Sequence, residues 1–464
     1  MQIFEKQIDP DEFYSGIKKY NIQYGSNENY SSPFSPSFVV LSQSDQNEFE
    51  LDLEVLALLY STATSLYLDS LTNSQHKWIK ECVENSLSDQ QIIATQITAN
   101  AKIEPAMTRV DYISFDNNFH KIAEVQWKSG GPGFLIGHDL LFREIYKLET
   151  STHPYGNLVE QYLLLLKELL LSTNRKIGCI INELRNEWLQ SEQFLINMAT
   201  NLGFDYIPVS RKSILENLLV NENNECIYKD NGKSIAVLRG RGFSDIISGS
   251  NVICLAKQSV QGEVWIEIPL NYILRQKWPM ALPFIPQYKH LFSDRLRNIL
   301  APTIIVRNQS VDFSPIVDFF EKEQKERLMS INNINQLVSL PESLRRMLII
   351  KNSSGIGDMQ NRGKGVFRLT GSRAYVRRNL DPIIHSMLLN NETWIIQPFI
   401  SKKYSVPHIQ NNIFHRGDCH ARFMLFGERK NHIWSTQGAL VNFSNNWKVT
   451  GSNEASLVSV RTMI

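Results

Sequence analysis

Apolar residues recur at helical spacing early in the chain, between residue 50 and about residue 101. One stretch reads LEVLALLYSTATSLYL, in which apolar side chains return every three or four positions. That spacing places them on one face of a helix. Residues 27–37 are instead rich in Ser, Pro and Asn, a composition typical of loops. Residues 1–100 are therefore predicted to form a mainly helical region.

Alternation of apolar and polar positions replaces the helical spacing after residue 107. Residues 108–115 and 121–127 each alternate as a half-buried strand does. Asp116, Asn117 and Asn118 lie between them and favour a turn. The two segments therefore predict a β-hairpin.

Strand-like and helix-like segments then alternate, which indicates α/β character. The predicted strands cover residues 176–182, 205–209, 225–229 and 234–239, and the predicted helices cover residues 187–202 and 213–220. Residues 270–345 are mainly helical, and the segment from residue 347 onward returns to strands. We expect an α/β (α+β) protein with mixed sheets, divided at residues 1–100, 101–345 and 346–464.

Composition and charge narrow the class of protein. The chain of 464 residues is 42% hydrophobic and 20% charged, with a formal net charge of +1. This composition is globular and offers no basic surplus to neutralise a nucleic-acid backbone. None of the five cysteines lies in a C-x-x-C pair, so we predict neither a disulfide framework nor a structural zinc site.

Two further features predict a cytoplasmic protein without a membrane partner. Residues 1–13 contain no apolar segment of the kind that a signal peptide has. The most apolar stretch, residues 162–171, is interrupted by Lys167 and Glu168 and is too short to span a bilayer. Scattered thiols are also typical of a reducing compartment.

The first candidate site lies on the predicted hairpin. Glu124 and Gln126 are two positions apart, so both side chains point to one face, and their oxygens suit Mg²⁺. Arg109 and Asp111 share a parity on the partner strand, and a guanidinium there can bind a carboxylate or a phosphate. Alternation alone equally fits a half-solvated hairpin without a ligand. The three glycines within residues 130–133, where backbone passes close to a neighbour, favour the functional interpretation.

A second candidate is a glycine-rich loop. A strand over residues 348–350 leads to Lys351, and another strand begins at Val366. The loop between them contains Gly355, Gly357, Arg362, Gly363, Lys364 and Gly365. Its backbone N–H groups can converge on phosphate oxygens, and lysines add positive charge. A strand follows the glycines, so this is neither a Walker A loop nor a Rossmann turn but the arrangement of a flap over ATP. A long mobile hairpin without a ligand is the alternative interpretation.

Two weaker signals follow. Residues 394–400 read WIIQPFI, a strand that ends in a polar residue and continues as a short linker. Backbone groups of such a linker can bond to an adenine edge, which makes Gln397, Phe399 and Ile400 candidates, although a simple buried strand has the same pattern. Arg422 faces opposite to its apolar neighbours on a later strand, where it can reach a phosphate or lie on the surface.

Taken in this order, the motifs resemble those of the circularly permuted ATP-grasp enzymes. That family includes eukaryotic-type glutathione synthetase and the synthetase domain of glutathionylspermidine synthase. R-V-D begins at Arg109, E-V-Q at Glu124 and K-N-S-S-G at Lys351, in the family's order of R-x-D, E-x-N and a lysine before a glycine-rich loop. The resemblance covers residues 100–450 and implies an ATP-grasp fold with a glycine-rich flap over ATP.

The resemblance implies an ATP-dependent carboxylate–amine ligase that forms an amide bond. In such an enzyme the substrate carboxylate attacks the γ-phosphate of ATP, and an amine then displaces phosphate from the acyl phosphate. The implied substrates are small molecules such as an amino acid, a peptide or a polyamine. Members of the family are often dimers, which makes a homodimer a candidate assembly.

The resemblance also assigns residues to roles. The implied catalytic residues are Arg109, Arg239, Arg241 and Arg422. The implied ATP ligands are Lys351, Gly355, Gly357, Gly363, Lys364, Gly365, Gln397, Phe399 and Ile400, with Lys322 or Lys325 as the second ATP-binding lysine. The implied Mg²⁺ ligands are Glu124, Gln126 and Asp358.

The chain departs from the family pattern at several positions. Gln126 replaces the asparagine of E-x-N, Asn352 replaces the proline after the loop lysine, and Asn442 stands where the family has an arginine. These departures leave two alternatives open. One is a degenerate ATP-grasp protein that binds nucleotide as a regulatory module, and the other is a phosphotransferase that stops at phosphorylation.

Overall fold

The structure is a computed structural model of the whole chain, and it describes most of its length. The described backbone covers residues 2–4, 9–19, 34–105, 107–116, 119–127, 179–184, 203–210, 216–220, 225–229, 232–240, 249–353, 365–401, 403–410, 413–430, 433–444 and 455–462, with isolated positions between 140 and 213. The description below refers to these residues.

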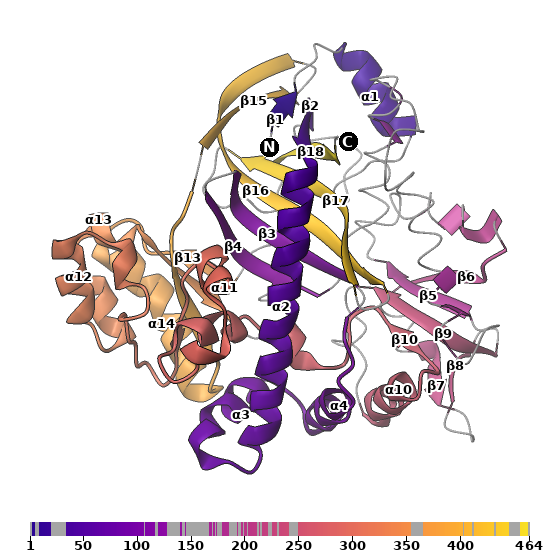
Figure 1. The fold of residues 1–464 in the computed structure, drawn as a ribbon, viewed down its shortest axis with the longest axis horizontal. Coiled ribbons are helices and arrows are strands. Elements are labelled where there is room, and N and C mark those ends of the chain that lie inside the picture. Colours follow the sequence, from indigo (N-terminus) through magenta and orange to yellow (C-terminus); the bar gives the residue numbers. More distant parts are fainter. Residues whose placement is uncertain are drawn as a thin grey trace.

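Eight strands form the largest sheet, which lies at the centre of the molecule (Figure 1). They are β1 (Gln2–Phe4), β2 (Phe34–Leu41), β3 (Met107–Asp116), β4 (Phe119–Gln126), β15 (Lys403–Gln410), β16 (Ile413–Lys430), β17 (Ile433–Ser444) and β18 (Ala455–Thr462). Their order is β1-β2-β18-β17-β16-β3-β4, and β15 pairs with both β16 and β2. The sheet thus joins strands from all three regions that the sequence pattern separated, with the early strand β2 parallel to the last strand, β18.

β3 and β4 form the hairpin that the alternation predicted. The four polar residues of the candidate site pair across the strands, Arg109 with Gln126 and Asp111 with Glu124. The residues between them point to the other face, where Trp127 joins the apolar core. A change of register by one residue would exchange the two faces, so core packing fixes the position of the polar pairs.

One long helix, α2 (Gln43–Ser70), lies across one face of the large sheet (Figure 1). A capping box begins it, in which Ser42 and Asp45 each accept a hydrogen bond from the other's backbone N–H. Its buried side chains recur every three or four positions, at Phe49, Leu53, Leu56, Tyr60, Ala63 and Tyr67. By length and composition alone α2 is able to cross a membrane. Here these side chains pack into the core cluster that they share with β3, β16 and β17.

The helical prediction for residues 50–101 is confirmed. The remaining helices of the first hundred residues are α1 (Pro10–Lys19), η1 (Ser74–His76), α3 (Lys77–Glu84) and α4 (Asp89–Asn100). β2, however, was not predicted, because Ser35, Pro36 and Ser37 interrupt its apolar pattern.

Six strands form a second sheet, which lies on the right in Figure 1. They are β5 (Cys179–Leu184), β6 (Tyr206–Ser210), β7 (Leu218–Val220), β8 (Cys226–Tyr228), β9 (Lys233–Gly240) and β10 (Trp265–Ile266), and α10 (Ser250–Val260) packs against them. The pairs β5–β6, β5–β9 and β9–β10 are parallel. The predicted strands of this region are thereby confirmed.

One helix of this region was predicted too long. The prediction covered residues 213–220, but Leu218–Val220 form β7, because Leu218 and Val220 pair with Tyr228 and Cys226 of β8. Cross-strand pairing thus overrides the local apolar spacing. Of the helix predicted over residues 187–202, the described positions between 193 and 201 are helical, and the rest lie outside the described residues.

A third sheet of four strands belongs to the body on the left in Figure 1. Its order is β11 (Ile304–Val306), β14 (Trp394–Pro398), β12 (Leu348–Asn352) and β13 (Val366–Arg368), all antiparallel. The strands predicted near residues 348, 366 and 394 are confirmed. α14 (Arg373–Leu389) packs in the core of this body but was not predicted, because Pro382 interrupts its helical pattern.

Short helices fill the segment between the second and third sheets, as the pattern over residues 270–345 predicted. They are η3 (Tyr272–Arg275), η4 (Trp278–Phe284), η5 (Lys289–Leu291), α11 (Asp294–Ile299), η6 (Val317–Phe319), α12 (Lys322–Met329), η7 (Ile334–Ser339) and α13 (Glu342–Arg345). Trp278 and Met280 of η4 are fully buried in the same core cluster as α2. η4 thus connects the third sheet to the large one.

The contact between α2 and β16 yields a test of the packing. A Cβ added at Gly427 would lie 2.4 Å from Cδ1 of the buried Leu53. Gly427→Ala should therefore destabilise the fold by about 1–3 kcal/mol through overpacking, and Leu53→Ala by about 2–5 kcal/mol through a cavity. The double variant should lose less than the sum in urea unfolding, because the added methyl group fills the cavity. Additive losses would show that the two residues do not contact each other.

Candidate functional site

Two arginines from neighbouring strands converge on one aspartate. Arg109 on β3 donates from Nε and Nη2 to the two carboxylate oxygens of Asp111, at 2.8 and 3.0 Å. Arg422 on β16 approaches the same carboxylate, with Nη1 3.6 Å from Oδ2. Arg109 and Asp111 are buried, so their bidentate pair is strengthened by the low local dielectric and holds the guanidinium plane in one orientation.

Glu124 and Gln126 lie beside this pair on β4. Gln126 Nε2 donates to Glu124 Oε1 at 3.1 Å, and Lys277 Nζ lies 3.5 Å from the same oxygen. The amide oxygen of Gln126 is buried and has no hydrogen-bond partner among the described residues. Mg²⁺ takes a few protein oxygens and completes its shell with water and phosphate. An orphaned amide oxygen beside a carboxylate therefore fits a magnesium ion.

Lys351 reaches the cluster from the third sheet, where it lies on β12. Its Nζ donates to the backbone oxygen of Ala123 at 3.1 Å. Lys277 is held nearby through Ser353, whose backbone oxygen accepts from Lys277 N at 3.1 Å and whose Oγ accepts from Trp278 N at 2.8 Å. Ser353 and Trp278 are buried, so these bonds tie the start of η4 to the end of β12. They bring together two lysines that lie far apart in the sequence.

The cluster carries more positive than negative charge. Its basic members are Arg109, Lys277, Lys351 and Arg422, and its acidic members are Asp111 and Glu124. Burial raises the pKa of Glu124, but Lys277 and the other cations outweigh burial and lower this pKa to about 2. Burial lowers the pKa of Lys351 to about 8, with Glu124 opposing this change and Lys277 adding to it. An anion would supply the missing negative charge, so the arrangement fits a phosphate or a carboxylate.

The comparisons with known proteins address the fold. Neither a protein-family model nor a curated protein sequence matches this chain. A solved structure does match, that of a glutathione synthetase-like effector from Globodera pallida in its apo form, with a TM-score of 0.57. The match covers 99% of this chain and 98% of that chain at 12% sequence identity. The chain has a glutathione synthetase-like fold. This confirms the resemblance drawn from the order of the motifs, and at this identity it shows the fold alone.

Within this glutathione synthetase-like fold, the lysine beside Lys351 is Lys277, which the sequence analysis did not single out. It lies in the segment RQKWPM, which carries no glycine or acidic motif. Lys325, the candidate from sequence, lies instead on α12 at the outer edge of the left-hand body (Figure 1) and pairs with Asp318 at 2.9 Å. The tertiary contacts of Lys277, the backbone bond to Ser353 and the ion pair with Glu124, distinguish it from Lys325.

Arg239 lies in the second sheet rather than in the cluster. It is buried on β9, where Nη1 donates to the hydroxyl of Tyr206 at 2.8 Å and Nε lies 3.4 Å from Glu267 Oε2. Burial lowers the pKa of this arginine, and Glu267 opposes the change. The contacts of Arg239 with Tyr206 and Glu267 thus join β9 to β6 and to the residue after β10.

The predicted adenine hinge is a buried strand end. Gln397 on β14 is buried, and its amide Nε2 donates to Thr303 Oγ1 at 2.8 Å. The backbone N–H of Phe399 donates to Met347 O at 2.6 Å, and Arg368 stacks 3.8 Å above the Phe399 ring. Ile400 follows at the half-buried start of the linker to β15. The side chain of Gln397 is therefore engaged inside the sheet, and any adenine contact there would come from backbone.

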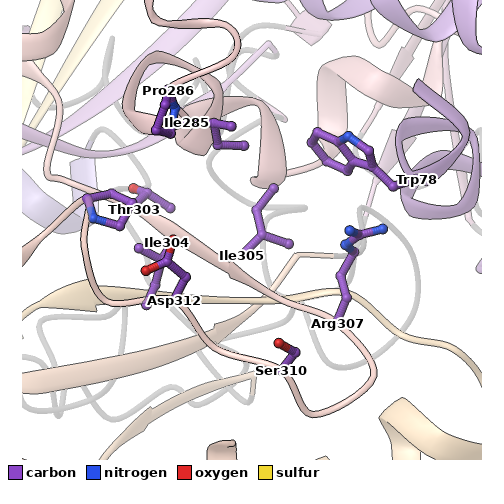
Figure 2. A pocket seen from close by; sticks show the side chains of 10 residues that line it. Trp78, Ile285, Pro286, Thr303, Ile304, Ile305, Arg307, Ser310 and Asp312 are labelled. Carbon is purple, nitrogen blue, oxygen red and sulfur yellow. The ribbon is translucent and has the colours of Figure 1, made fainter. Parts of the chain in front are cut away.

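Thr303 also lines a cavity of about 270 Å³ on the outer side of β11. Figure 2 shows Ile305 in the middle of its wall, Trp78 and Arg307 to one side, and Thr303 and Asp312 to the other. The Arg307 guanidinium stacks 4.9 Å from the Trp78 ring centroid. No member of the basic cluster lines this cavity, so it is a separate feature of the contact between the third sheet and the helical layer.

Several residues named from the sequence lie outside the described part of the chain. They are Arg241, Gly355, Gly357, Asp358, Gly363 and Lys364. At the end of the glycine-rich loop, Gly365 accepts a backbone hydrogen bond from Asn352 at 2.8 Å. The Asn352 side chain donates to Glu392 at 2.9 Å. Asn442 pairs with Arg422 in the register of β16 and β17.

The electrostatics of the cluster can be tested without any ligand. Glu124 raises the pKa of Lys351 and Lys277 lowers it. Glu124→Gln should therefore move this pKa below about 8, whereas Lys277→Met should move it upward, each by about one unit. NMR titration of ¹³C-labelled lysine side chains measures both variants. Equal pKa values in the two variants would show that the three groups do not share one site.

Proposed function

We propose that this chain is an ATP-dependent ligase that joins a small-molecule carboxylate to an amine. The observation that carries the proposal is the gathering of Lys277, Lys351, Arg109 and Arg422 around Glu124, next to the orphaned oxygen of Gln126. A partly buried site with surplus positive charge and two hard oxygen ligands suits a magnesium-bound nucleotide and a carboxylate substrate. The glutathione synthetase-like fold supports the same assignment.

The residues divide into two sides around the reacting groups. Lys277 and Lys351 approach from η4 and β12, where their ammonium groups would bind phosphate oxygens. Arg109 and Arg422 approach from the large sheet, where they would orient the substrate carboxylate. Glu124 and Gln126 would hold Mg²⁺, which neutralises phosphate charge when bound.

In the proposed reaction, a carboxylate oxygen forms a bond to the γ-phosphorus while the bond to the β-phosphate oxygen breaks and ADP leaves. The amine then attacks the acyl carbon, loses a proton and expels inorganic phosphate. The protein supplies no nucleophile, so its contribution is positioning and charge stabilisation. The preformed cluster matches that requirement, because internal hydrogen bonds already hold the Arg109 guanidinium at Asp111 and the Lys351 ammonium at the backbone oxygen of Ala123.

A second candidate is a nucleotide-binding protein without turnover. The position after the loop lysine favours this candidate, because the family pattern has a proline there and this chain has Asn352. The Asn352 side chain donates to Glu392 at 2.9 Å. The matched structure is also described as that of an effector, and this description names no enzymatic activity for that protein.

Turnover separates the two candidates. With Mg-ATP and a panel of amino acids, peptides and polyamines, supplied singly and in pairs, ADP release should require both a carboxylate and an amine. Glu124→Ala and Lys351→Ala should each lower the rate at least about a hundredfold, because each removes charge stabilisation at the phosphates. Lys325→Ala is the matched control, since this lysine is outside the cluster and pairs with Asp318. ATP-induced thermal stabilisation without ADP release would support the binding protein instead.

The pKa of Lys351 predicts a pH dependence of nucleotide affinity. Lys351 is protonated below about pH 8 and loses its charge above it. A bound phosphate stabilises the charged form, so affinity for Mg-ATP should be highest below this pH and fall by up to about tenfold per pH unit above it. Calorimetric titration at a series of pH values measures this slope. Lys351→Arg keeps its charge and should show no slope, and an equal slope in both proteins would assign the titration to another group.

A further inference from the structure

A second cavity lies on the opposite face of the β3–β4 hairpin from the basic cluster. Its volume is about 130 Å³, and its walls come from α2, the segment after α4, the end of β4, and β16 and β17. Trp127 lines it and directly follows Gln126 in the sequence. Since consecutive strand residues point to opposite faces, this cavity and the Glu124–Gln126 site lie back to back.

Three buried N–H groups of residues that line this cavity have no hydrogen-bond partner among the described residues. They are Nε1 of Trp127, Nε1 of Trp434 and Nε of Arg429. The two tryptophans are only 3% and 2% exposed. A buried donor left without an acceptor is unfavourable, and most buried polar groups of native proteins are paired. Three such donors among the residues of one lining indicate that an acceptor is missing.

The lining offers few acceptors of its own. Thr64 Oγ1 already accepts from Asn271 at 3.2 Å and donates to Tyr60 O at 2.8 Å. The hydroxyl of Tyr60 donates to Gln276 O at 3.2 Å. Glu104 pairs with Arg429, and no carboxylate among the described residues pairs with Lys102 on the same lining. The cavity is therefore rich in donors and carries surplus positive charge.

The remaining walls are aromatic and apolar. Tyr60 and Trp127 contact edge to face, with ring centroids 5.2 Å apart, and Trp127 and Trp434 lie 5.7 Å apart. Arg429 lies directly opposite Trp434 in the register of β16 and β17, with its guanidinium 5.9 Å from the ring. These rings form a rigid surface for an apolar group, next to the unpaired donors.

We propose that this cavity is a binding site for a small organic carboxylate, separate from the site of ligation. Its two oxygens offer enough lone pairs to accept from both indole N–H groups and from Arg429 Nε. Its apolar body would pack against Tyr60 and the two indole rings. Because Glu104 balances the charge of Arg429, the net positive charge of the lining is that of Lys102, and it selects an anion over a neutral molecule of the same shape.

The test uses the full chain labelled with 5-fluorotryptophan and followed by ¹⁹F NMR. Trp127→Phe and Trp434→Phe assign the two resonances. Titration with 3-methylbutanoate should shift both resonances to saturation and leave that of Trp394, in the core of the third sheet, unmoved. The neutral alcohol 3-methylbutan-1-ol should bind at least about tenfold more weakly, because it lacks the charge-assisted hydrogen bonds.

Two variants show at which of the two sites 3-methylbutanoate binds. Arg429→Ala should weaken 3-methylbutanoate binding at least about tenfold, whereas Arg422→Ala, which removes a proposed carboxylate-binding arginine of the basic cluster, should leave it unchanged. Should Arg429→Ala not fold, the milder Trp434→Phe removes one donor, keeps an aromatic ring and should weaken binding in the same direction. The proposal is overturned if no resonance saturates, because the cavity then holds only water. It is also overturned if Arg422→Ala abolishes the shifts, because the carboxylate then binds at the basic cluster.

Discussion

The two faces of the β3–β4 hairpin are the constraint on which the rest of the structure depends. Glu124 and Gln126 must face the basic cluster if Val125 and Trp127 are to face α2, because neighbouring strand residues point to opposite sides. A slip by one residue would bury the charge of Glu124 and the amide of Gln126 in an apolar core, at a cost far above that of the correct pairing. The aromatic packing around Trp127 thus fixes the register, and the register aligns the polar side chains.

The ion pairs of the cluster balance only part of its charge. Lys277 and Lys351 repel each other, and each contributes to the low pKa of Glu124 while burial opposes the charge of Lys351. Besides the ion pair of Lys277 with Glu124, neutral contacts fix the segment that carries Lys277: two hydrogen bonds from backbone N–H groups to the buried Ser353, and the packing of Trp278. Packing energy elsewhere therefore offsets an arrangement that is unfavourable until an anion binds.

How much the sequence predicts depends on whether a feature is local. The hairpin, the parity of its polar residues and most strands follow from period-two alternation, which is a local signal. Lys277 could not be found this way, because its role depends on bonds to Ser353 from a distant segment. Lys325 was preferred because of its place in the chain, yet its charge is used on the surface by Asp318. β7 was missed because cross-strand pairing outweighs local spacing there, and α14 was missed because Pro382 interrupts the pattern of a helix that forms nonetheless.

The same limit applies to the second cavity. Trp127 and Trp434 look like ordinary core aromatics in the sequence, and their packing confirms that role. Their hydrogen bonding cannot be read from the sequence. In the structure, two indole N–H groups and Arg429 Nε have no partner among the described residues. Trp127 is joined directly to Gln126, so a ligand that orders its indole would also act on the backbone of the strand that carries the proposed metal ligands. Coupling between the two proposed sites would require that this strand have two arrangements that both ligands favour unequally.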